Sequence, residues 1–162
     1  MSVHSFQNDS RISAHQAVVA LGSNLGDREK SLLAALKDLA LLGEIRATSH
    51  FYETPYEGNK GPQAAYLNAA TLLSTDKTVW EFFEGLLGIE KSYGRLTKGD
   101  DAPRVIDLDL IFFDNMVADY GDLILPHPRM HLRRFVLDPV ADVAPEWVHP
   151  VFRRTVRVLG QR

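Results

Sequence analysis

The sequence predicts an α+β fold in which helices pack on an antiparallel sheet. Short apolar, β-branched runs alternate with two longer segments that carry leucine or phenylalanine at helical spacing, and the connections between them are rich in Gly and Pro. The elements follow the order strand, helix, strand, strand, helix, strand. This βαββαβ order is that of the ferredoxin-like, or split βαβ, arrangement, with two helices on one face of the sheet and a C-terminal extension after it.

The first half of the pattern contains a strand, a helix and a second strand. Residues 17–22 (AVVALG) form an apolar run, and Asp27 then opens a helix in which leucines recur at helical spacing. Gly43 is expected to stop this helix. Residues 45–53 predict a strand that runs into a long turn-rich loop at 54–62.

The second half repeats the pattern and adds an extension. Residues 66–74 predict a strand, and residues 77–91 predict a helix with an apolar face. After a polar loop, residues 104–114 (RVIDLDLIFFD) alternate as a strand does. A short strand near 123–125 and a helix over about 128–140 are expected to follow.

Length and composition limit the class of protein. The chain has 162 residues, 45% of them apolar, which suits one domain over 17–162 after a disordered leader at 1–16. The leader lacks the apolar core of a signal peptide, and no later stretch is long enough to span a bilayer. A formal charge of -3 argues against general affinity for nucleic acid or anionic membrane. The absence of cysteine suits a cytoplasmic protein whose metal sites use oxygen or imidazole ligands.

Two aspartates lie two residues apart on the strand predicted at 104–114. Side chains alternate along a strand, so Asp107 and Asp109 point to the same face. Two adjacent carboxylates repel each other unless a proton or cation compensates, and Mg²⁺ is the natural candidate. An exposed strand with an acidic solvent face explains this short motif equally well.

Basic residues surround this carboxylate pair. Arg95, Lys98 and Arg104 precede it within one loop-and-strand segment and could bind phosphate oxygens. Cations and carboxylates together suggest a site for a metal-bound nucleotide. Ion pairing between the arginines and the aspartates is the alternative for any one of these residues.

Two further groups of residues are candidates for ligand contacts. Tyr66 and Asn68 share one face of the strand at 66–74 and offer an aromatic ring and an amide to a planar heterocycle, although the pair taken alone is more typical of structural residues. Thr54 and Pro55 could add backbone hydrogen-bonding groups from the next loop.

Phosphate contacts are also physically reasonable at the start of the last helix, where His127 precedes it and Arg133 lies in it, because helix N-termini favour anions. Residues 22–27 (GSNLGD) resemble a phosphate loop only weakly, since they lack both G-x-G-x-x-G and the Walker lysine. We interpret them as a tight turn and a helix cap.

Several segments, taken together and in order, resemble the motifs of the pterin pyrophosphokinase family, and the similarity covers about residues 17–150. PR-x-x-D-x-D followed by PHP-x-M-x-x-R-x-F is the most specific part. The segments are ALGSNLGD (20–27), FYETP (51–55), YLNAA (66–70), GR (94–95), APRVIDLDLIFF (102–113) and LPHPRMHLRRFVLDP (125–139).

The resemblance implies an activity and a role for each candidate residue. A diphosphate group would pass from ATP to the hydroxymethyl oxygen of 6-hydroxymethyl-7,8-dihydropterin, and AMP would leave. Asp107 and Asp109 would hold two Mg²⁺ ions. The implied phosphate contacts are Arg95, Arg104, His127 and Arg133, with Lys98 nearby. The implied nucleoside contacts are Glu90 and the backbone near Leu110. The implied pterin contacts are Tyr66, Phe135 and Asn68, with backbone groups of Thr54, Pro55 and Glu57.

The chain departs from this family's pattern in the loop over 95–103. The family usually carries an aromatic-Gly-Pro-Arg sequence there, whereas this chain has KGDDAPR and no tryptophan. We expect an active enzyme in which this loop behaves differently, because loop closure often sets the rate of product release.

Two other functions fit parts of the sequence. The same metal pair could hydrolyse a nucleotide, although no histidine or glutamate stands beside the aspartates. An RNA-binding module of similar fold would need exposed aromatic residues and a basic sheet face, where this chain has Asp107 and Asp109. We therefore expect a monomer that acts on ATP and a pterin alcohol, without nucleic-acid or membrane partners.

Overall fold

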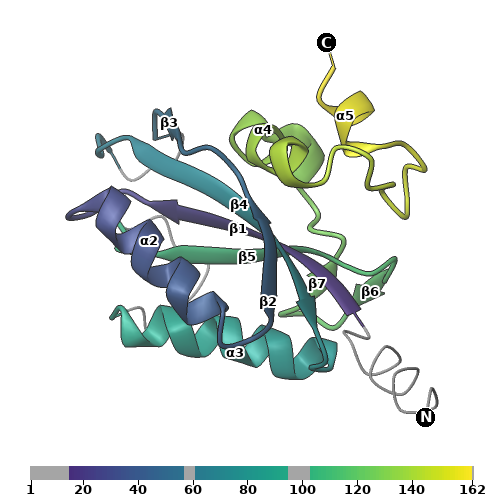
Figure 1. Cartoon of the computed structure of the whole chain (residues 1–162). Coiled ribbons are helices and arrows are strands. Elements are labelled where there is room, and N and C mark those ends of the chain that lie inside the picture. The colour runs from purple at the N-terminus through teal and green to yellow at the C-terminus, as the bar shows by residue number, and fades with distance from the viewer. Residues whose placement is uncertain (1–14, 57–60, 95–102, 162) are drawn as a thin grey trace.

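The chain folds as an antiparallel sheet with helices on it. A computed structural model describes residues 15–56, 61–94 and 103–161. Its main sheet has the order β2-β4-β1-β5, with the short β3 also paired to β4, and every pairing in it is antiparallel (Figure 1). The strands are β1 (His15–Ser23), β2 (Glu44–Thr48), β3 (Tyr52–Thr54), β4 (Tyr66–Thr75) and β5 (Asp107–Phe113), and a separate hairpin pairs β6 (Ala118–Asp119) with β7 (Ile124–Leu125).

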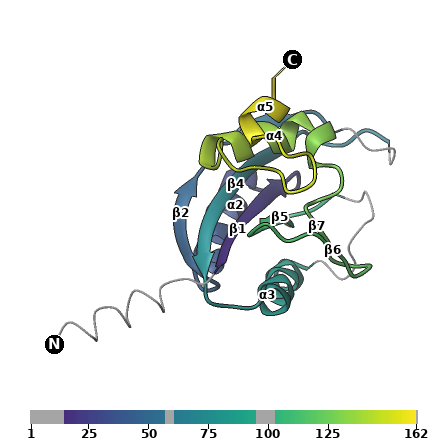
Figure 2. The ribbon, with the colours of Figure 1, turned by 90° about the vertical axis from the view of Figure 1, so that its right-hand side faces the viewer.

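Helices cover both faces of this sheet (Figure 2). They are α2 (Arg28–Leu39), α3 (Val79–Ser92), α4 (Arg134–Val143) and α5 (Val156–Leu159), and a 3₁₀ turn, η1 (Met130–Leu132), precedes α4. The apolar sides of α2 and α3 pack with Leu21 and Leu108 in one core cluster. The apolar side of α4 packs with Val18 and Ile111 in a second cluster on the opposite face.

The prediction that two helices pack on one face is confirmed. No face was predicted for the C-terminal helix, which packs on the other one. Local chemistry fixes where α2 and α3 start. The Asp27 carboxylate accepts the N–H of Lys30 at 3.1 Å, which confirms the predicted cap, and Thr78 and Glu81 form a reciprocal capping box at α3. Described residues contain no helix with the length and apolarity that crossing a membrane requires.

Several predicted boundaries were wrong. β1 begins at His15, inside the segment expected to be a leader, and residues 1–14 lie outside the described residues. The first helix ends at Leu39, before Gly43, because the chain turns at Ala40. β5 begins at Asp107 rather than at residue 104. The last helix begins at Arg134 rather than near Pro128, because η1 occupies the preceding turn and Arg133 has an extended backbone.

The strand predicted at 45–53 divides into β2 and β3 at Ser49. The Ser49 hydroxyl accepts the N–H of Ala70 at 2.9 Å, while the Ser49 N–H donates to the Ala70 carbonyl at 2.9 Å. A side chain therefore takes the place of a backbone acceptor, and the regular ladder stops. The break leaves β3 to pair with the first residues of β4, where the cavity described below lies.

The C-terminal segment folds back over α4 around a buried histidine. The His149 side chain is 3% exposed, and its Nδ1 accepts the N–H groups of Val151 and Phe152 at 3.2 and 3.1 Å. Burial lowers the pKa of His149 below its ordinary value, and the electrostatic effect of the nearby His131 ring acts in the same direction. The neutral ring is thus the form that the fold accommodates.

This histidine predicts a pH dependence of stability. In the unfolded chain His149 binds a proton as the pH falls through about 6.5, while in the folded chain it stays neutral to a lower pH. The free energy of unfolding should therefore decrease as the pH falls below about 6.5. Urea unfolding between pH 5 and 8 tests this: His149→Asn, which keeps an acceptor, should flatten the slope, and an unchanged slope would contradict the assignment.

A close backbone contact at Gly43 predicts a second effect on stability. A Cβ at Gly43 would lie 2.4 Å from the carbonyl oxygen of Ser74, which belongs to the sheet and cannot move aside. Gly43→Ala should destabilise the protein by roughly 1–3 kcal/mol in urea unfolding. Gly88→Ala is the matched control, because its Cβ would meet nothing within 4 Å and should stabilise α3 by roughly 0.5–1 kcal/mol.

Candidate functional site

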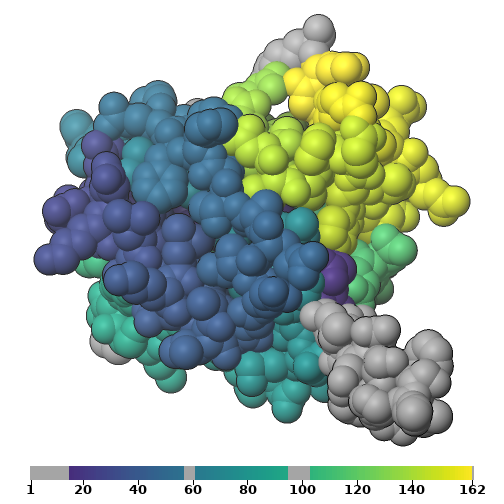
Figure 3. Space-filling view, viewed as in Figure 1, coloured from purple at the N-terminus to yellow at the C-terminus, as the bar shows by residue number. Residues whose placement is uncertain are grey.

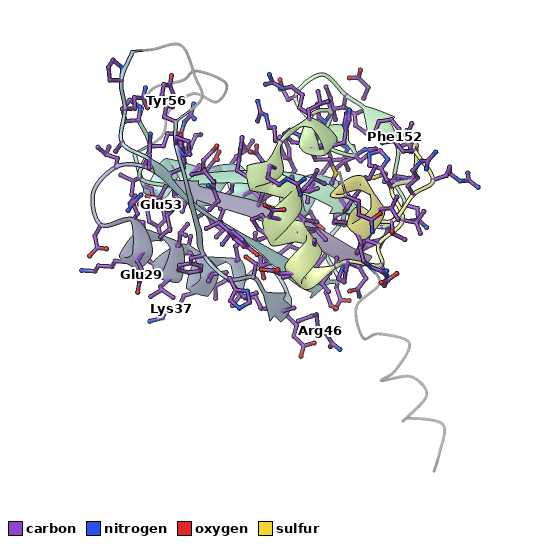
Figure 4. All side chains as sticks on the ribbon, turned by 90° about the horizontal axis from the view of Figure 1, so that it is seen from above. Glu29, Lys37, Arg46, Glu53, Tyr56 and Phe152 are labelled. Carbon is purple, nitrogen blue, oxygen red and sulfur yellow. The ribbon has the colours of Figure 1, made fainter. Side chains whose placement is uncertain are left out.

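A cavity of about 410 Å³ opens on the face of the sheet that carries α4, near the start of that helix. The volume is within the range of small-molecule sites. Its lining combines strands β1, β3, β4 and β5 with the segment from η1 to α4: Ala20, Leu21, Gly22, Thr54, Pro55, Tyr56, Tyr66, Asn68, Arg104, Asp107, Asp109, Arg129, Arg133, Phe135 and Val136. Figure 4 looks down on α4 and shows Tyr56 on the segment that follows β3.

The floor of the cavity is set by strand register. Gly22 on the central strand β1 lies opposite Asn68 of β4 on one side and Asp107 of β5 on the other. Ala20 lies in the same way between Ala70 and Asp109. Residues opposite each other in a sheet point to the same face. The Asn68 amide and the Asp107 carboxylate therefore lie on one face, two interstrand spacings or about 10 Å apart, with Gly22 between them.

Gly22 also leaves room for the ring of Tyr66. A Cβ at residue 22 would lie 3.2 Å from Tyr66 Cδ1 and 3.4 Å from Asn68 Oδ1. The hydrogen bond that Asn68 Nδ2 donates to Thr54 Oγ1, at 2.7 Å, fixes the orientation of the amide. Its carbonyl oxygen is thus directed toward the floor, where it can accept a hydrogen bond from a ligand.

The two aspartates share one face, as predicted, with Leu108 buried between them on the other. The Asp107 side chain is 23% exposed, and Arg104 Nη1 lies 3.9 Å from its carboxylate. This contact leaves ion pairing between Arg104 and the aspartates open as the alternative to phosphate binding. Among the described residues no group of three or more potential metal ligands occurs. A pair of carboxylates still fits Mg²⁺, which commonly takes one or two carboxylates and completes its shell with water and substrate phosphates.

Cationic side chains complete the cavity. Arg104 comes from the residues before β5, while Arg129 and Arg133 come from the segment around η1. The Arg133 guanidinium lies over the ring of Phe135, 5.5 Å from its centroid. Three arginines thus share the cavity with two carboxylates, which is the charge pattern of a site for a polyanion with bound metal.

A hydrogen-bonded contact joins α4 to β3. The Asp142 carboxylate accepts the Tyr52 hydroxyl at 2.8 Å and the His50 backbone N–H at 3.1 Å. Burial and the Asp142 carboxylate raise the pKa of Tyr52 to about 12, so this donor keeps its proton. In the space-filling view, the blue segment through β3 and the green-yellow segment through α4 meet side by side (Figure 3). The contact fixes the spacing of two walls of the cavity.

Most of the predicted site residues come together here. Those that line the cavity are Thr54, Pro55, Tyr66, Asn68, Arg104, Asp107, Asp109, Arg133 and Phe135. Glu57, Arg95 and Lys98 lie outside the described residues. Glu90, Leu110 and His127 are described but are not part of the lining.

These last three residues have other surroundings. Glu90 on α3 is 2% exposed, and its carboxylate accepts the N–H of Leu108 at 2.7 Å. Leu110 packs in the core under α2 and α3. The His127 N–H donates to the Ile111 carbonyl at 3.0 Å, and its Nδ1 accepts the Arg129 N–H at 3.2 Å. Their roles in nucleotide binding stay predictions.

Sequence reasoning missed other residues of the cavity. Arg129 lies inside the PHP-x-M segment and was not assigned a role, although its charge and position beside His127 were a usable signal. Gly22 and Ala20 gave no signal, because small residues on a strand become meaningful only when their cross-strand partners are known.

The fold is α+β, and the cavity combines two carboxylates, three arginines, an amide and aromatic rings, which suits the class of enzymes that act on a phosphate-bearing substrate and a flat heterocycle. The model of the 7,8-dihydro-6-hydroxymethylpterin-pyrophosphokinase (HPPK) family matches residues 18–145. The chain belongs to this family.

Individual relatives agree with this assignment. The chain is 38% identical over 144 residues to the 2-amino-4-hydroxy-6-hydroxymethyldihydropteridine pyrophosphokinase of Synechocystis, covering 88% of this chain and 73% of that protein. It is 39% identical over 129 residues to the protein of the same name from Bacillus subtilis, covering 78% of this chain and 77% of that one. It is also 36% identical to the folic acid synthesis protein fol1 of Pneumocystis carinii, covering 90% of this chain but only 20% of that protein.

A solved structure supports the fold. Wild-type Plasmodium falciparum HPPK-DHPS with pteroate superposes with a TM-score of 0.70 at 18% sequence identity, over 92% of this chain and 42% of that one. At this identity the likeness concerns the fold alone. The chain spans less than half the length of that larger protein.

The contact between Gly22 and Tyr66 predicts a selective effect on ligand binding. Gly22→Val should displace the Tyr66 ring, because even a single Cβ already lies 3.2 Å from it. We expect the KM for 6-hydroxymethyl-7,8-dihydropterin to rise about tenfold or more, which is the usual scale for one badly placed contact. The KM for ATP should change less. Gly160→Ala is the control, with its nearest Cβ neighbour at 3.6 Å; equal changes in both KM values would argue against this assignment.

Proposed function

We propose that this cavity carries out the diphosphate transfer of folate biosynthesis, from ATP to the hydroxymethyl group of 6-hydroxymethyl-7,8-dihydropterin, with release of AMP. The observation that carries the proposal is the row Asn68, Gly22 and Asp107, which sets an amide for a heterocycle and a carboxylate for a metal on one floor about 10 Å apart. Membership of the pyrophosphokinase family supports the same reaction.

The pterin would occupy the half of the cavity between β3, β4 and the start of α4. Tyr66 and Phe135 both line it and offer aromatic faces to a flat ring. The Asn68 carbonyl, held by the bond from Nδ2 to Thr54, can accept an N–H of the pterin edge. Thr54 and Pro55 also line the cavity, and their backbone groups are proposed to contact the pterin, as is Glu57.

The triphosphate would occupy the half over β5. Asp107 and Asp109 would hold two Mg²⁺ ions, which supply neutralisation of phosphate charge when bound. Arg104 and Arg133 would contact the phosphate oxygens, and Arg95, Lys98 and His127 are proposed to assist. Glu90 and the backbone near Leu110 are proposed for the nucleoside.

The reaction requires no covalent bond between the protein and either substrate. The hydroxymethyl oxygen forms a bond to the β-phosphorus while the bond from that phosphorus to the oxygen bridging the α- and β-phosphates breaks. AMP leaves with the bridging oxygen, and the hydroxyl proton passes to solvent. The chain's arginines orient the phosphates and balance the developing charge, so no strong general base is required.

The finer descriptions of the protein are also proposals. A ferredoxin-like fold is supported by the strand order β2-β4-β1-β5 with antiparallel neighbours and by α2 and α3 on one face. A monomer that acts on small molecules in the cytoplasm is consistent with the balanced charge and the absence of cysteine.

Formation of AMP tests the function directly. Wild type should release AMP from ATP only when Mg²⁺ and the pterin alcohol are both present. Asp107→Ala and Asp109→Ala should each lower kcat by about a thousandfold or more, because each removes a fixed charge that faces the phosphates.

A matched control removes a carboxylate elsewhere. Asp122 is exposed and does not line the cavity, so Asp122→Ala should keep wild-type rates. Release of ADP and free phosphate without a diphosphorylated pterin would identify a hydrolase instead. Full activity in both cavity variants would show that the carboxylates do not hold the metal.

A further inference from the structure

A buried amide at the end of β1 is bonded to segments that lead into both halves of the cavity. Asn24 follows the last residue of β1 and is 3% exposed. β1 runs between β4, which carries Tyr66 and Asn68, and β5, which carries Asp107 and Asp109. From the end of β1 a short side chain can therefore reach the segments that lead into both neighbouring strands.

On one side Asn24 holds the residue that precedes β5. Its Oδ1 accepts the N–H of Arg104 at 2.9 Å, and its own N–H donates to the Arg104 carbonyl at 3.0 Å. Two hydrogen bonds thus fix both polar groups of one backbone unit. The Arg104 side chain, 10% exposed and within 3.9 Å of Asp107, is oriented from that backbone.

On the other side Asn24 holds the residues that precede β4. Its Nδ2 donates to Gln63 Oε1 at 3.0 Å and to the Ala64 carbonyl at 3.4 Å. Arg28 adds a bond from Nη1 to the Ala65 carbonyl at 2.9 Å. Tyr66 follows directly, so its ring is positioned by a segment that these bonds attach to the end of β1.

The pattern differs from that of an ordinary helix cap. The cap of α2 is supplied by Asp27, and every side-chain bond of Asn24 goes to Gln63, Ala64 or Arg104, which lie 39 to 80 residues away in sequence. Leaving such a buried amide unpaired would be costly. Its bonds are divided between the phosphate half and the pterin half of the cavity.

We propose that Asn24 is a positioning residue for the transfer reaction, which holds Arg104 and Tyr66 at the spacing that brings the two substrates together. This inference rests on the proposed function for its kinetic part. Asn24 touches neither substrate. It acts through the backbone of Arg104 and through the segment before Tyr66, and a small displacement of either reacting group is known to cost orders of magnitude in rate.

Three variants separate the two sides of the contact. Asn24→Ala removes the side-chain bonds on both sides and keeps only the backbone bond to the Arg104 carbonyl. We expect kcat/KM to fall between ten- and a hundredfold, with KM raised for both ATP and the pterin alcohol. Asn24→Asp keeps an acceptor for the Arg104 N–H but loses the donor to Gln63 and to the Ala64 carbonyl, so KM should rise about tenfold for the pterin alcohol and stay within twofold for ATP. Gln63→Ala should behave as Asn24→Asp does, and combining those two changes should add nothing further.

Thr75→Val is the control for a merely structural effect. Thr75 is 2% exposed at the far end of β4, where its hydroxyl donates to the Leu42 carbonyl at 2.7 Å and accepts the Lys77 N–H at 3.1 Å. This variant should lower Tm as much as Asn24→Ala does and leave both KM values and kcat within twofold of wild type. The proposal is overturned if Thr75→Val gives the same kinetic loss, or if Asn24→Ala leaves kcat and both KM values within twofold.

Amide hydrogen exchange supplies a readout that does not depend on turnover. The Arg104 N–H should exchange at least tenfold faster in Asn24→Ala and at the wild-type rate in Gln63→Ala. Unchanged exchange in Asn24→Ala would overturn the positioning role. A wild type that makes no AMP would instead overturn the proposed function, and the exchange rates would still decide whether Asn24 holds Arg104.

Discussion

The register of β1 between β4 and β5 is the constraint on which the rest of the molecule depends. Because Gly22 faces both Asn68 and Asp107, the distance between an amide and a carboxylate is fixed by backbone hydrogen bonds and not by flexible side chains. A slip of one residue in either pairing would turn these groups toward the apolar core under α2 and α3. The buried leucines on that face therefore stabilise the geometry of the cavity as well as the fold.

The two faces of the sheet differ in what they carry, because the cavity lies on the α4 face alone. One face is fully covered by α2 and α3, which gives the strands a rigid support. The other is covered by α4 over only part of its length, and the cavity occupies the remaining end. Carboxylates thus come from the supported sheet, while Arg129 and Arg133 come from a connecting segment that is held through Asp142 and Tyr52.

The sequence predicted those parts of the site that depend on local periodicity. Alternation along a strand was enough to put Asp107 beside Asp109 and Tyr66 beside Asn68, and cap chemistry was enough for Asp27. The break at Ser49, the face on which α4 packs and the bonds of Asn24 to Arg104 depend on partners more than 20 residues away in sequence, so no local pattern contains them. The late start of α4 was missed because a 3₁₀ turn has nearly the same spacing as a helix.

Between Asn68 and the two aspartates, the floor of the cavity consists largely of backbone, since Ala20 and Gly22 contribute almost no side chain to it. An inhibitor that rests on this floor would contact atoms that no substitution can remove. A larger residue at either position would obstruct the inhibitor and the natural substrates alike. Resistance would therefore have to arise at other lining residues, such as Tyr56 and Arg129, whose side chains can change.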